Sequence, residues 1–426
     1  MNTTDLDLPT EIAETLVTPQ AYADFDGLHA AYTWARNNNP LGRAVTRDFD
    51  PFWAVTKHAD VAAISRDNVL FSNVVRDSIL ADRETLEMHR RLSGGNPFRT
   101  LVQLDDPEHR KLRMLTHAWF QPGNVAKLET KIRAIARDVV ERMAARGACE
   151  FVTDFASGYP LHVIMEVLGV PPEDEQRMLT LTQEVFGAED PELRRDKLAA
   201  LTPEQRASIS AAVFGDFGAY FARITEDRRT RPRNDVATIL ANATIDGHPL
   251  DLVTLTSYYI IIATAGHDTT ASSTATGMWA LCRFPALLPA LKADPAKIPA
   301  FVEEAIRWQT PVRHFMRTAT ADTEIRGRKI AKGDWLMLCY GSANRDEEVF
   351  ERPFEYRIDR DANKQIAFGL GGHTCLGQHL ARLEMRVLLE ELLPRLDAVE
   401  QTGPMTMTVA SFVGGPKRLP IRYRMR

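Results

Sequence analysis

Helical periodicity dominates the pattern of apolar and polar positions along the chain. Residues 126–147 carry apolar side chains every three or four positions, and Gly147 is a typical residue at which a helix ends. Residues 378–393 show a second amphipathic pattern of this kind. Residues 255–284 are longer and apolar on nearly every face, which predicts a buried central helix that closes before Pro285.

Segments with the character of β-strands are short. Residues 52–56 form one such segment, residues 323–341 predict a pair of hairpin strands, and residues 418–424 form the last. We find no internal repeat and no low-complexity linker. These observations predict a fold that is mainly α with small β-sheets, organised as a single domain over residues 1–426.

Composition narrows the class of protein. The chain is 44% apolar and 26% charged, which is typical of a globular protein, and its net charge of −5 disfavours a nucleic-acid partner. Its most apolar window, residues 257–266, is too short for a membrane span of roughly 20 residues. The acidic first residues lack the apolar core of a signal peptide, so we expect a cytoplasmic protein. The four cysteines lie far apart, which excludes a zinc ribbon and disfavours a disulfide framework.

The segment FGLGGHTCLG, residues 368–377, places Cys375 among four glycines just before a predicted helix. A dinucleotide-binding loop is disfavoured, because the third glycine of that pattern falls on Thr374. A nucleophilic thiol has one nearby base, His373, and no further residue of a triad beside it. A metal-binding thiolate fits better, since a helix N-terminus stabilises it and glycines allow close approach to a flat group. One cysteine suits an axial haem ligand rather than a cluster that needs four.

The same ten residues match, position for position, the cysteine-ligand loop of the cytochrome P450 family, and the chain resembles this family over essentially its whole length. The resemblance implies a triangular prism of helices with haem b between the central helix and the cysteine loop. It implies that Cys375 is the iron ligand. It also places Phe368, Gly369, His373 and Gly377 of the loop against the cofactor.

A second motif, AGHDTT at residues 265–270, interrupts the apolar central helix. Its flanks are apolar on every face, so we expect Asp268 and the threonines to be buried and to serve a function. The Thr269 hydroxyl can bond back to the Ala265 carbonyl and open the helix. The resemblance implies that Ala265 and Gly266 border the haem, that Thr269 stabilises activated oxygen, and that Asp268 belongs to a proton relay. We interpret the intervening histidine, His267, as structural.

Candidate cations for the haem propionates come from separate segments. His109 and Arg113 are four residues apart on a predicted helix, and a solvated basic face would explain them as well. The resemblance implies that both bind the propionates, together with Arg317 from a strand and His373 from the cysteine loop.

A third motif is Glu304-x-x-Arg307 in the segment EEAIRW. On a helix the two side chains share one face, but surface pairs of this kind are common and contribute little to stability. The resemblance implies a buried structural pair near the cofactor, completed by the later Arg360.

The substrate is predicted only as a class. Within the family, the chain resembles soluble bacterial members that oxidise terpineol and relatives that act on aromatic hydrocarbons. We therefore expect a small hydrophobic substrate, either a monoterpenoid or an aromatic hydrocarbon. The role of His314, close to the expected wall, stays open. The residues expected to line the substrate pocket are Phe186, Val312, Phe315, Phe412 and Val413.

The resemblance implies a monooxygenase that inserts one oxygen atom from O2. The chain has no flavin, nicotinamide or iron–sulfur motif, so electrons must come from separate proteins. In similar enzymes these are a two-iron two-sulfur ferredoxin and an NADH-dependent ferredoxin reductase. A peroxide-driven peroxygenase would normally have lost the acid–threonine pair, and a haem-thiolate sensor would not need it, but Asp268 and Thr269 are both present.

Overall fold

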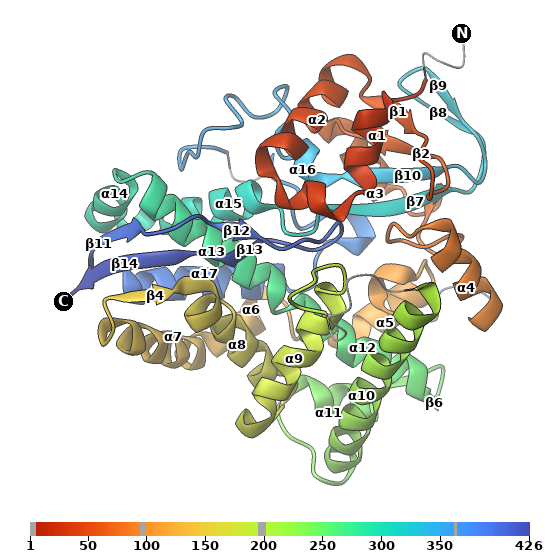
Figure 1. Ribbon diagram of the computed structural model, residues 1–426. Coiled ribbons are helices and arrows are strands. Elements are labelled where there is room, and N and C mark those ends of the chain that lie inside the picture. Colours follow the sequence, from red (N-terminus) through yellow and green to blue (C-terminus); the bar gives the residue numbers. More distant parts are fainter. Residues whose placement is uncertain (1–5, 94–98, 195–201, 362–363) are drawn as a thin grey trace.

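Helices make up most of the computed structural model, which describes residues 6–93, 99–194, 202–361 and 364–426 (Figure 1). The prediction of a mainly helical fold with small sheets is confirmed. The helices are α1 (Thr10–Val17), α2 (Phe25–Asn38), α3 (His58–Arg66), α4 (Arg83–Ser93), α5 (Glu108–His117), α6 (Pro122–Val125), α7 (Glu129–Ala144), α8 (Gly158–Leu168), α9 (Glu175–Phe186), α10 (Pro203–Thr230), α11 (Val236–Asn242), α12 (Leu252–Ala265), α13 (Asp268–Arg283), α14 (Leu287–Ala293), α15 (Ile298–Gln309), α16 (Tyr340–Ala343) and α17 (Gln378–Leu392).

The strands are short, as the sequence predicts. They are β1 (Leu41–Ala44), β2 (Phe52–Val55), β3 (Phe71–Ser72), β4 (Ala148–Glu150), β5 (Thr244–Ile245), β6 (His248–Pro249), β7 (His314–Ala319), β8 (Thr323–Ile325), β9 (Arg328–Ile330), β10 (Trp335–Cys339), β11 (Leu396–Gln401), β12 (Thr406–Met407), β13 (Pro416–Arg418) and β14 (Pro420–Met425). The largest sheet has the order β1-β2-β10-β7-β3, and a second sheet has the order β11-β14-β4.

The prediction of a hairpin pair over residues 323–341 is wrong for the last strand. β8 and β9 form a hairpin, but β10 pairs in parallel with β2 and antiparallel with β7 inside the largest sheet. The physical reason is burial: β10 is buried along its whole length, with alternate residues facing two different apolar clusters. Such a strand needs neighbours on both edges and cover on both faces, which a small exposed hairpin cannot give.

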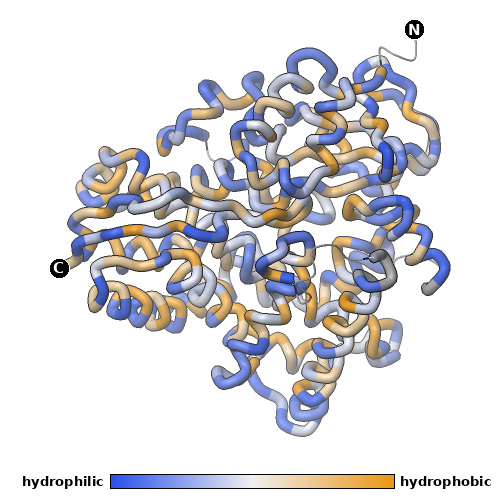
Figure 2. Tube along the Cα trace, viewed as in Figure 1, coloured by the Kyte–Doolittle hydropathy of each residue, from blue (hydrophilic) through white to orange (hydrophobic). Residues whose placement is uncertain are grey.

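The largest apolar core lies between the long helices. It draws on α7, α8, α10, α12, α13, α15 and α17. Two smaller clusters pack on opposite faces of the β1-β2-β10-β7-β3 sheet, one under α1 and α2 and the other under α3. Figure 2 shows apolar residues gathered on the inward sides of these elements. None of the helices in the described ranges has the length and apolar content needed to cross a bilayer.

The predicted central helix is divided into two. α12 ends at Ala265 and α13 begins at Asp268, so residues 266–267 interrupt one apolar rod. The Thr269 hydroxyl donates to the Ala265 carbonyl at 2.9 Å, which is the back-bond expected from the motif. A side chain on Gly266 would meet Ile164 at 2.6 Å, so this position has no room for a larger residue. The break therefore lies where a neighbouring helix, α8, packs tightly against the chain.

Candidate active site

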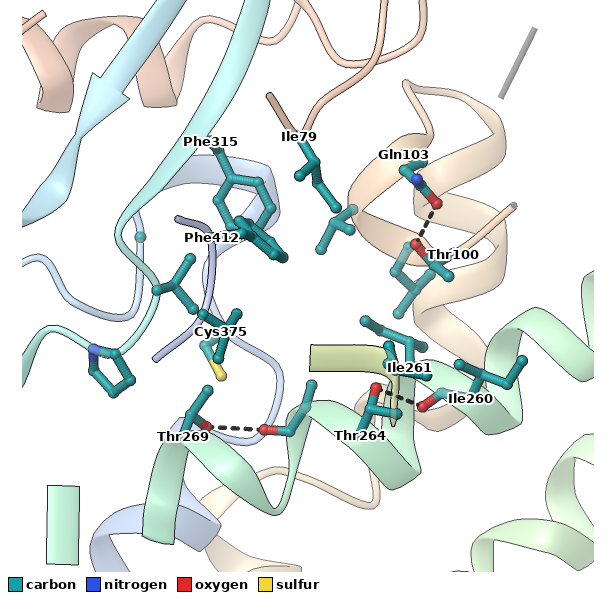
Figure 3. A pocket seen from close by; sticks show the side chains of 18 of the residues that line it. Ile79, Thr100, Gln103, Ile260, Ile261, Thr264, Thr269, Phe315, Cys375 and Phe412 are labelled. Atoms are coloured by element: carbon teal, nitrogen blue, oxygen red, sulfur yellow. Dashed lines mark hydrogen bonds between the residues drawn. The ribbon is translucent and has the colours of Figure 1, made fainter. Parts of the chain in front are cut away.

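One cavity of about 1180 Å³ brings together residues from most of the motifs. Its walls include the end of α12 and the start of α13, the loop before α17, strand β7, and the loop around Phe412. Figure 3 shows the Cys375 sulfur directed into this space, with Thr269, Phe315 and Phe412 on the walls around it. The cysteine loop and the interrupted helix, distant in sequence, thus face the same volume.

The cysteine loop has the backbone geometry that its glycines allow. Gly369 and Gly371 have positive φ angles of 68° and 74°, which other residues adopt only with strain. A side chain on Gly371 would come within 2.5 Å of the Ser65 carbonyl oxygen. The Cys375 amide donates to the Phe368 carbonyl at 2.8 Å and closes the loop. The glycines therefore serve a tight turn that packs against the end of α3.

The electrostatic surroundings of Cys375 combine opposing effects. Burial raises the pKa of the thiol, whereas hydrogen bonds from the backbone amides of Gly377 and Gln378 and the charge of Arg113 lower it. The expected stabilisation by the N-terminus of α17 is present, but in the protein alone burial outweighs it. A metal cation bound to the sulfur deprotonates a thiol outright, so the donor set fits a metal ligand.

Four cationic or potentially cationic side chains, here called the cationic cluster, line the same cavity: His109, Arg113, Arg317 and His373. The rings of His109 and His373 stack with their centroids 3.9 Å apart. Arg113 Nη2 donates to the Thr374 carbonyl at 2.7 Å, and Arg317 Nη1 donates to the Met316 carbonyl at 2.8 Å. The predicted convergence of three segments is therefore observed.

The cationic cluster lacks enough anions of its own. Arg317 is 3% exposed, and within the described ranges its Nε atom and the Nε2 atom of His109 have no hydrogen-bond partner. Burial, and then the neighbouring His109, Arg317 and Arg113, lower the pKa of His373 to about 2, so this imidazole is neutral unless an anion joins it. Asp106 Oδ1 lies 3.4 Å from Nδ1 of His109, but among the described residues neither Arg113 nor Arg317 forms an ion pair with a carboxylate. Buried cations without such partners are costly, so the cluster fits a bound group with anionic oxygens, as the propionates of haem b are.

The Glu304, Arg307 and Arg360 side chains meet in a buried network. Glu304 accepts two hydrogen bonds from Arg307, both at 2.7 Å, and one from Arg360 Nε at 3.1 Å. The backbone amide of Arg357 also donates to Glu304 at 2.9 Å. The glutamate thus connects α15 to the segment that leads into the cysteine loop.

The side chain of Asp268 makes different contacts from that of its neighbour Thr269. Its Oδ1 atom lies 3.1 Å from Nδ1 of His267, and its Oδ2 atom is buried with no hydrogen-bond partner among the described residues. Burial raises the pKa of Asp268, and the neighbouring His267 opposes this shift. His267 is fully buried, and its Nε2 atom is 2.8 Å from the Ser157 carbonyl. These contacts hold the carboxyl group beside the helix break.

The predicted substrate wall is largely present. Val312 and Val413 form an isolated β-bridge, and the rings of Phe315 and Phe412 meet edge to face at 5.3 Å; all four residues line the cavity. The side chain of Phe186, also predicted, lies outside the described part of the chain.

His314 supports this wall from behind. Its side chain is fully buried, and its ring packs edge to face on Phe412 at 5.7 Å. The Leu80 amide lies 3.4 Å from Nε2 of His314. Burial lowers the pKa of His314 to about 4, so the ring is neutral near pH 7.

Several wall residues carry no signal in the sequence motifs. Ile260 and Ile261 precede the AGHDTT motif by one helical turn, so the helical period of α12 could have indicated them. Thr264 directly precedes the motif on the same helix. Nothing in the sequence marks Ile79, Thr100 and Gln103, because they reach the cavity from separate segments. The wall residues missed by motif analysis include Ile79, Thr100, Gln103, Ile260, Ile261 and Thr264.

Comparisons with known proteins agree with this geometry. The family model for cytochrome P450 matches residues 298–419. Cytochrome P450-terp from Pseudomonas sp. is 47% identical over 423 residues, which are 98% of each chain. The crystal structure of CYP108D1 from Novosphingobium aromaticivorans is 43% identical with a TM-score of 0.91, over 99% of this chain and 100% of that one. CYP268A2 from Mycobacterium marinum, solved in complex with pseudoionone, is 29% identical with a TM-score of 0.85 over 98% of each chain.

Proposed function

The chain belongs to the cytochrome P450 family of haem monooxygenases, and from this we propose that it oxidises a small hydrophobic substrate with electrons from a ferredoxin. The observation that carries the proposal is the single cavity shared by Cys375, the cationic cluster and Thr269. One oxygen atom from O2 enters the substrate in this reaction. A two-iron two-sulfur ferredoxin and an NADH-dependent reductase would supply the electrons, because the chain has no redox motif besides its haem site.

We assign a separate role to each group of residues in and beside the cavity. Cys375 would ligate the haem iron through Sγ, and the cationic cluster would bind the propionates. Bound haem supplies the reductive activation of O2, and electron donation from the thiolate favours cleavage of the O–O bond. Thr269 would present its hydroxyl beside the helix break, and Asp268 would act in proton transfer near it.

The substrate class is supported by the walls of the cavity. Val312, Phe315, Phe412 and Val413 give an apolar surface to the cavity that Cys375 also lines. A relative carries the name Cytochrome P450-terp, and another was solved with pseudoionone. We therefore favour monoterpenoids, with aromatic hydrocarbons as the second class.

Titration of the purified ferric holoprotein with both classes tests this proposal. A bound substrate that displaces water from the iron shifts the Soret band from its low-spin to its high-spin position. We expect saturable shifts with monoterpenoids or aromatic hydrocarbons of about ten carbons, and only weak shifts with steroids or long fatty acids. A reversed order, with steroids or fatty acids bound more tightly, would refute the proposed substrate class.

Replacing Thr269 by alanine is expected to uncouple NADH consumption from product formation. The variant removes the hydroxyl that bonds to Ala265 at the helix break. Product formed per NADH should fall about a hundredfold, the lower end of the effect of a positioned proton-transfer group, while hydrogen peroxide rises. Thr269→Ser should restore most of the coupling. Thr264→Ala, which removes a similar back-bond to Ile260 one turn earlier, is the matched control; full coupling in Thr269→Ala would remove the assigned role.

Reversing the charge of Arg110 is expected to slow reduction by the ferredoxin. Arg110 is exposed on α5, the helix whose Arg113 bonds to Thr374 beside Cys375, so its charge lies on the thiolate side of the protein. In stopped-flow experiments at low salt, Arg110→Glu should reduce the rate about tenfold and leave the substrate titration unchanged. Arg424→Glu, an exposed charge on β14, should have no effect. Equal rates for both variants would contradict this docking face.

A further inference from the structure

Two hydrogen-bonded polar residues, Thr100 and Gln103, lie in an otherwise apolar part of the cavity wall. Residues Leu101–Gln103 form a single 3₁₀ turn, and Thr100 precedes it. The Thr100 hydroxyl donates to Oε1 of the Gln103 side chain at 2.8 Å, while the backbone amide of Gln103 donates to the Thr100 carbonyl at 2.9 Å. The side chains of Thr100 and Gln103 both line the cavity. These two bonds fix the orientation of the Gln103 side-chain amide.

In this fixed orientation, the side-chain amide of Gln103 keeps N–H donors that are free to bond. With Oε1 bound to Thr100, the two N–H groups on Nε2 of Gln103 have no acceptor among the residues that the structure describes. The hydroxyls of Thr264 and Thr269, which line the same cavity, already donate to the carbonyls of Ile260 and Ala265. Gln103 is therefore a neutral group on this wall that can still donate to a ligand.

Apolar surroundings make the free N–H groups of Gln103 selective for ligands that carry a hydrogen-bond acceptor. Figure 3 shows Gln103 and Thr100 on the side of the cavity away from the Cys375 sulfur, with apolar side chains around the space between them. A ligand that fills this space is desolvated, so a polar group left unpaired there costs free energy, on the ligand and on Gln103 alike. The apolar residues concerned include Ile79, Leu101, Ile260, Ile261, Phe315 and Phe412.

We propose that Gln103 binds the hydroxyl group of a terpenoid alcohol, an inference that rests on the proposed monooxygenase function. A hydroxyl oxygen accepts from Nε2, and its proton can be donated to the second lone pair of Oε1. An alcohol can bond to both the N–H and the carbonyl oxygen of the Gln103 side chain. A ketone can bond only to the N–H, and an aromatic hydrocarbon can bond to neither. Gln103 thus separates the two substrate classes that the apolar walls alone accept equally.

The same bond sets the position of the reaction. With the hydroxyl held at Gln103, the hydrocarbon end of the substrate lies toward Cys375. The oxygen atom from O2 then enters a carbon remote from the existing hydroxyl, and the product is a diol. Loss of the bond should leave the ligand free to turn and should give a mixture of products.

Equilibrium titration of the ferric holoprotein with α-terpineol and with limonene, its analogue without the hydroxyl, tests the inference. The wild-type protein should bind α-terpineol about tenfold more tightly than limonene, the factor of one net hydrogen bond. Gln103→Leu should lose this preference, with weaker binding of α-terpineol and a change of at most about twofold for limonene. Val102→Ala, an apolar change on the same wall, should affect both ligands alike. The ferrous–carbon monoxide spectrum confirms that each variant retains its haem.

The possible outcomes are distinct. A tenfold preference in the wild type that disappears in Gln103→Leu and is partly kept in Gln103→Asn supports the anchor. Equal affinities in the wild type, or equal losses for both ligands in Gln103→Leu, overturn it and leave the monooxygenase function standing. Tighter binding of a terpenoid carboxylic acid than of the alcohol also overturns it, and points instead to Arg194, whose buried Nε and Nη2 atoms line the cavity region without a partner among the described residues. Absence of any spin shift with every terpenoid overturns the anchor together with the favoured substrate class, the monoterpenoids.

Discussion

Replacing Cys375 by serine is expected to abolish both the red-shifted ferrous–carbon monoxide band and monooxygenase activity. The sulfur of Cys375 points into the cavity and accepts hydrogen bonds from the amides of Gly377 and Gln378, which supports its proposed role as the thiolate ligand of the iron. A serine alcohol ionises far less readily than a thiol and is a poorer electron donor to iron. Difference spectra of the reduced protein with carbon monoxide measure the band, and product analysis measures the activity.

The matched control for this substitution is Cys282→Ser. Cys282 lies on α13 at the edge of the apolar core and away from the cavity, so its variant should keep both the band and the activity. A haem assay on each protein separates loss of the ligand from loss of the cofactor. Retention of the red-shifted band in Cys375→Ser would mean that another residue binds the iron, and would refute the assignment.

Local sequence patterns were sufficient for the parts of the site that depend on consecutive residues. The cysteine loop is predictable because its glycines, cysteine and following helix act together within ten residues. The break at AGHDTT is predictable because a hydroxyl four residues after a carbonyl can replace the backbone bond, as Thr269 does with Ala265. In both cases short-range geometry determines the structure, and the central core follows from helical periodicity.

The parts that depend on distant segments were not predictable in the same way. β10 joins β2 and β7 because its two apolar faces need cover, and no feature of residues 323–341 alone identifies those partners. Gln103, in a short 3₁₀ turn, and Ile79 reach the cavity from segments without a motif, so only the packed structure brings them to the wall. The contact between Asp268 and His267 is a matter of side-chain direction, which a residue pattern does not specify.

Replacing Glu304 by glutamine is expected to destabilise the protein by about 3–5 kcal/mol, the usual cost of breaking a buried ion pair by removing one partner. Glu304 is 2% exposed and accepts from both Arg307 and Arg360, while Arg307 is itself 2% exposed. The neutral amide leaves the Arg307 charge buried without a counterion. Urea unfolding followed by circular dichroism should show a clearly lower midpoint. Haem content should fall too, because Glu304 ties α15 to the segment before the cysteine loop.

Glu351→Gln is the control that separates burial from charge. Glu351 is also an acidic partner of arginines, Arg352 and Arg357, but its side chain is 76% exposed, so water already screens these pairs. Its loss should cost less than about 1 kcal/mol. Arg307→Lys should lie between the two variants, because lysine keeps the charge and loses the two-pronged bond to Glu304. If Glu304→Gln and Glu351→Gln unfolded at the same urea concentration, the network would contribute no more than a surface pair, and the stability of the cysteine loop would have to come from its own backbone bonds and its packing against α3.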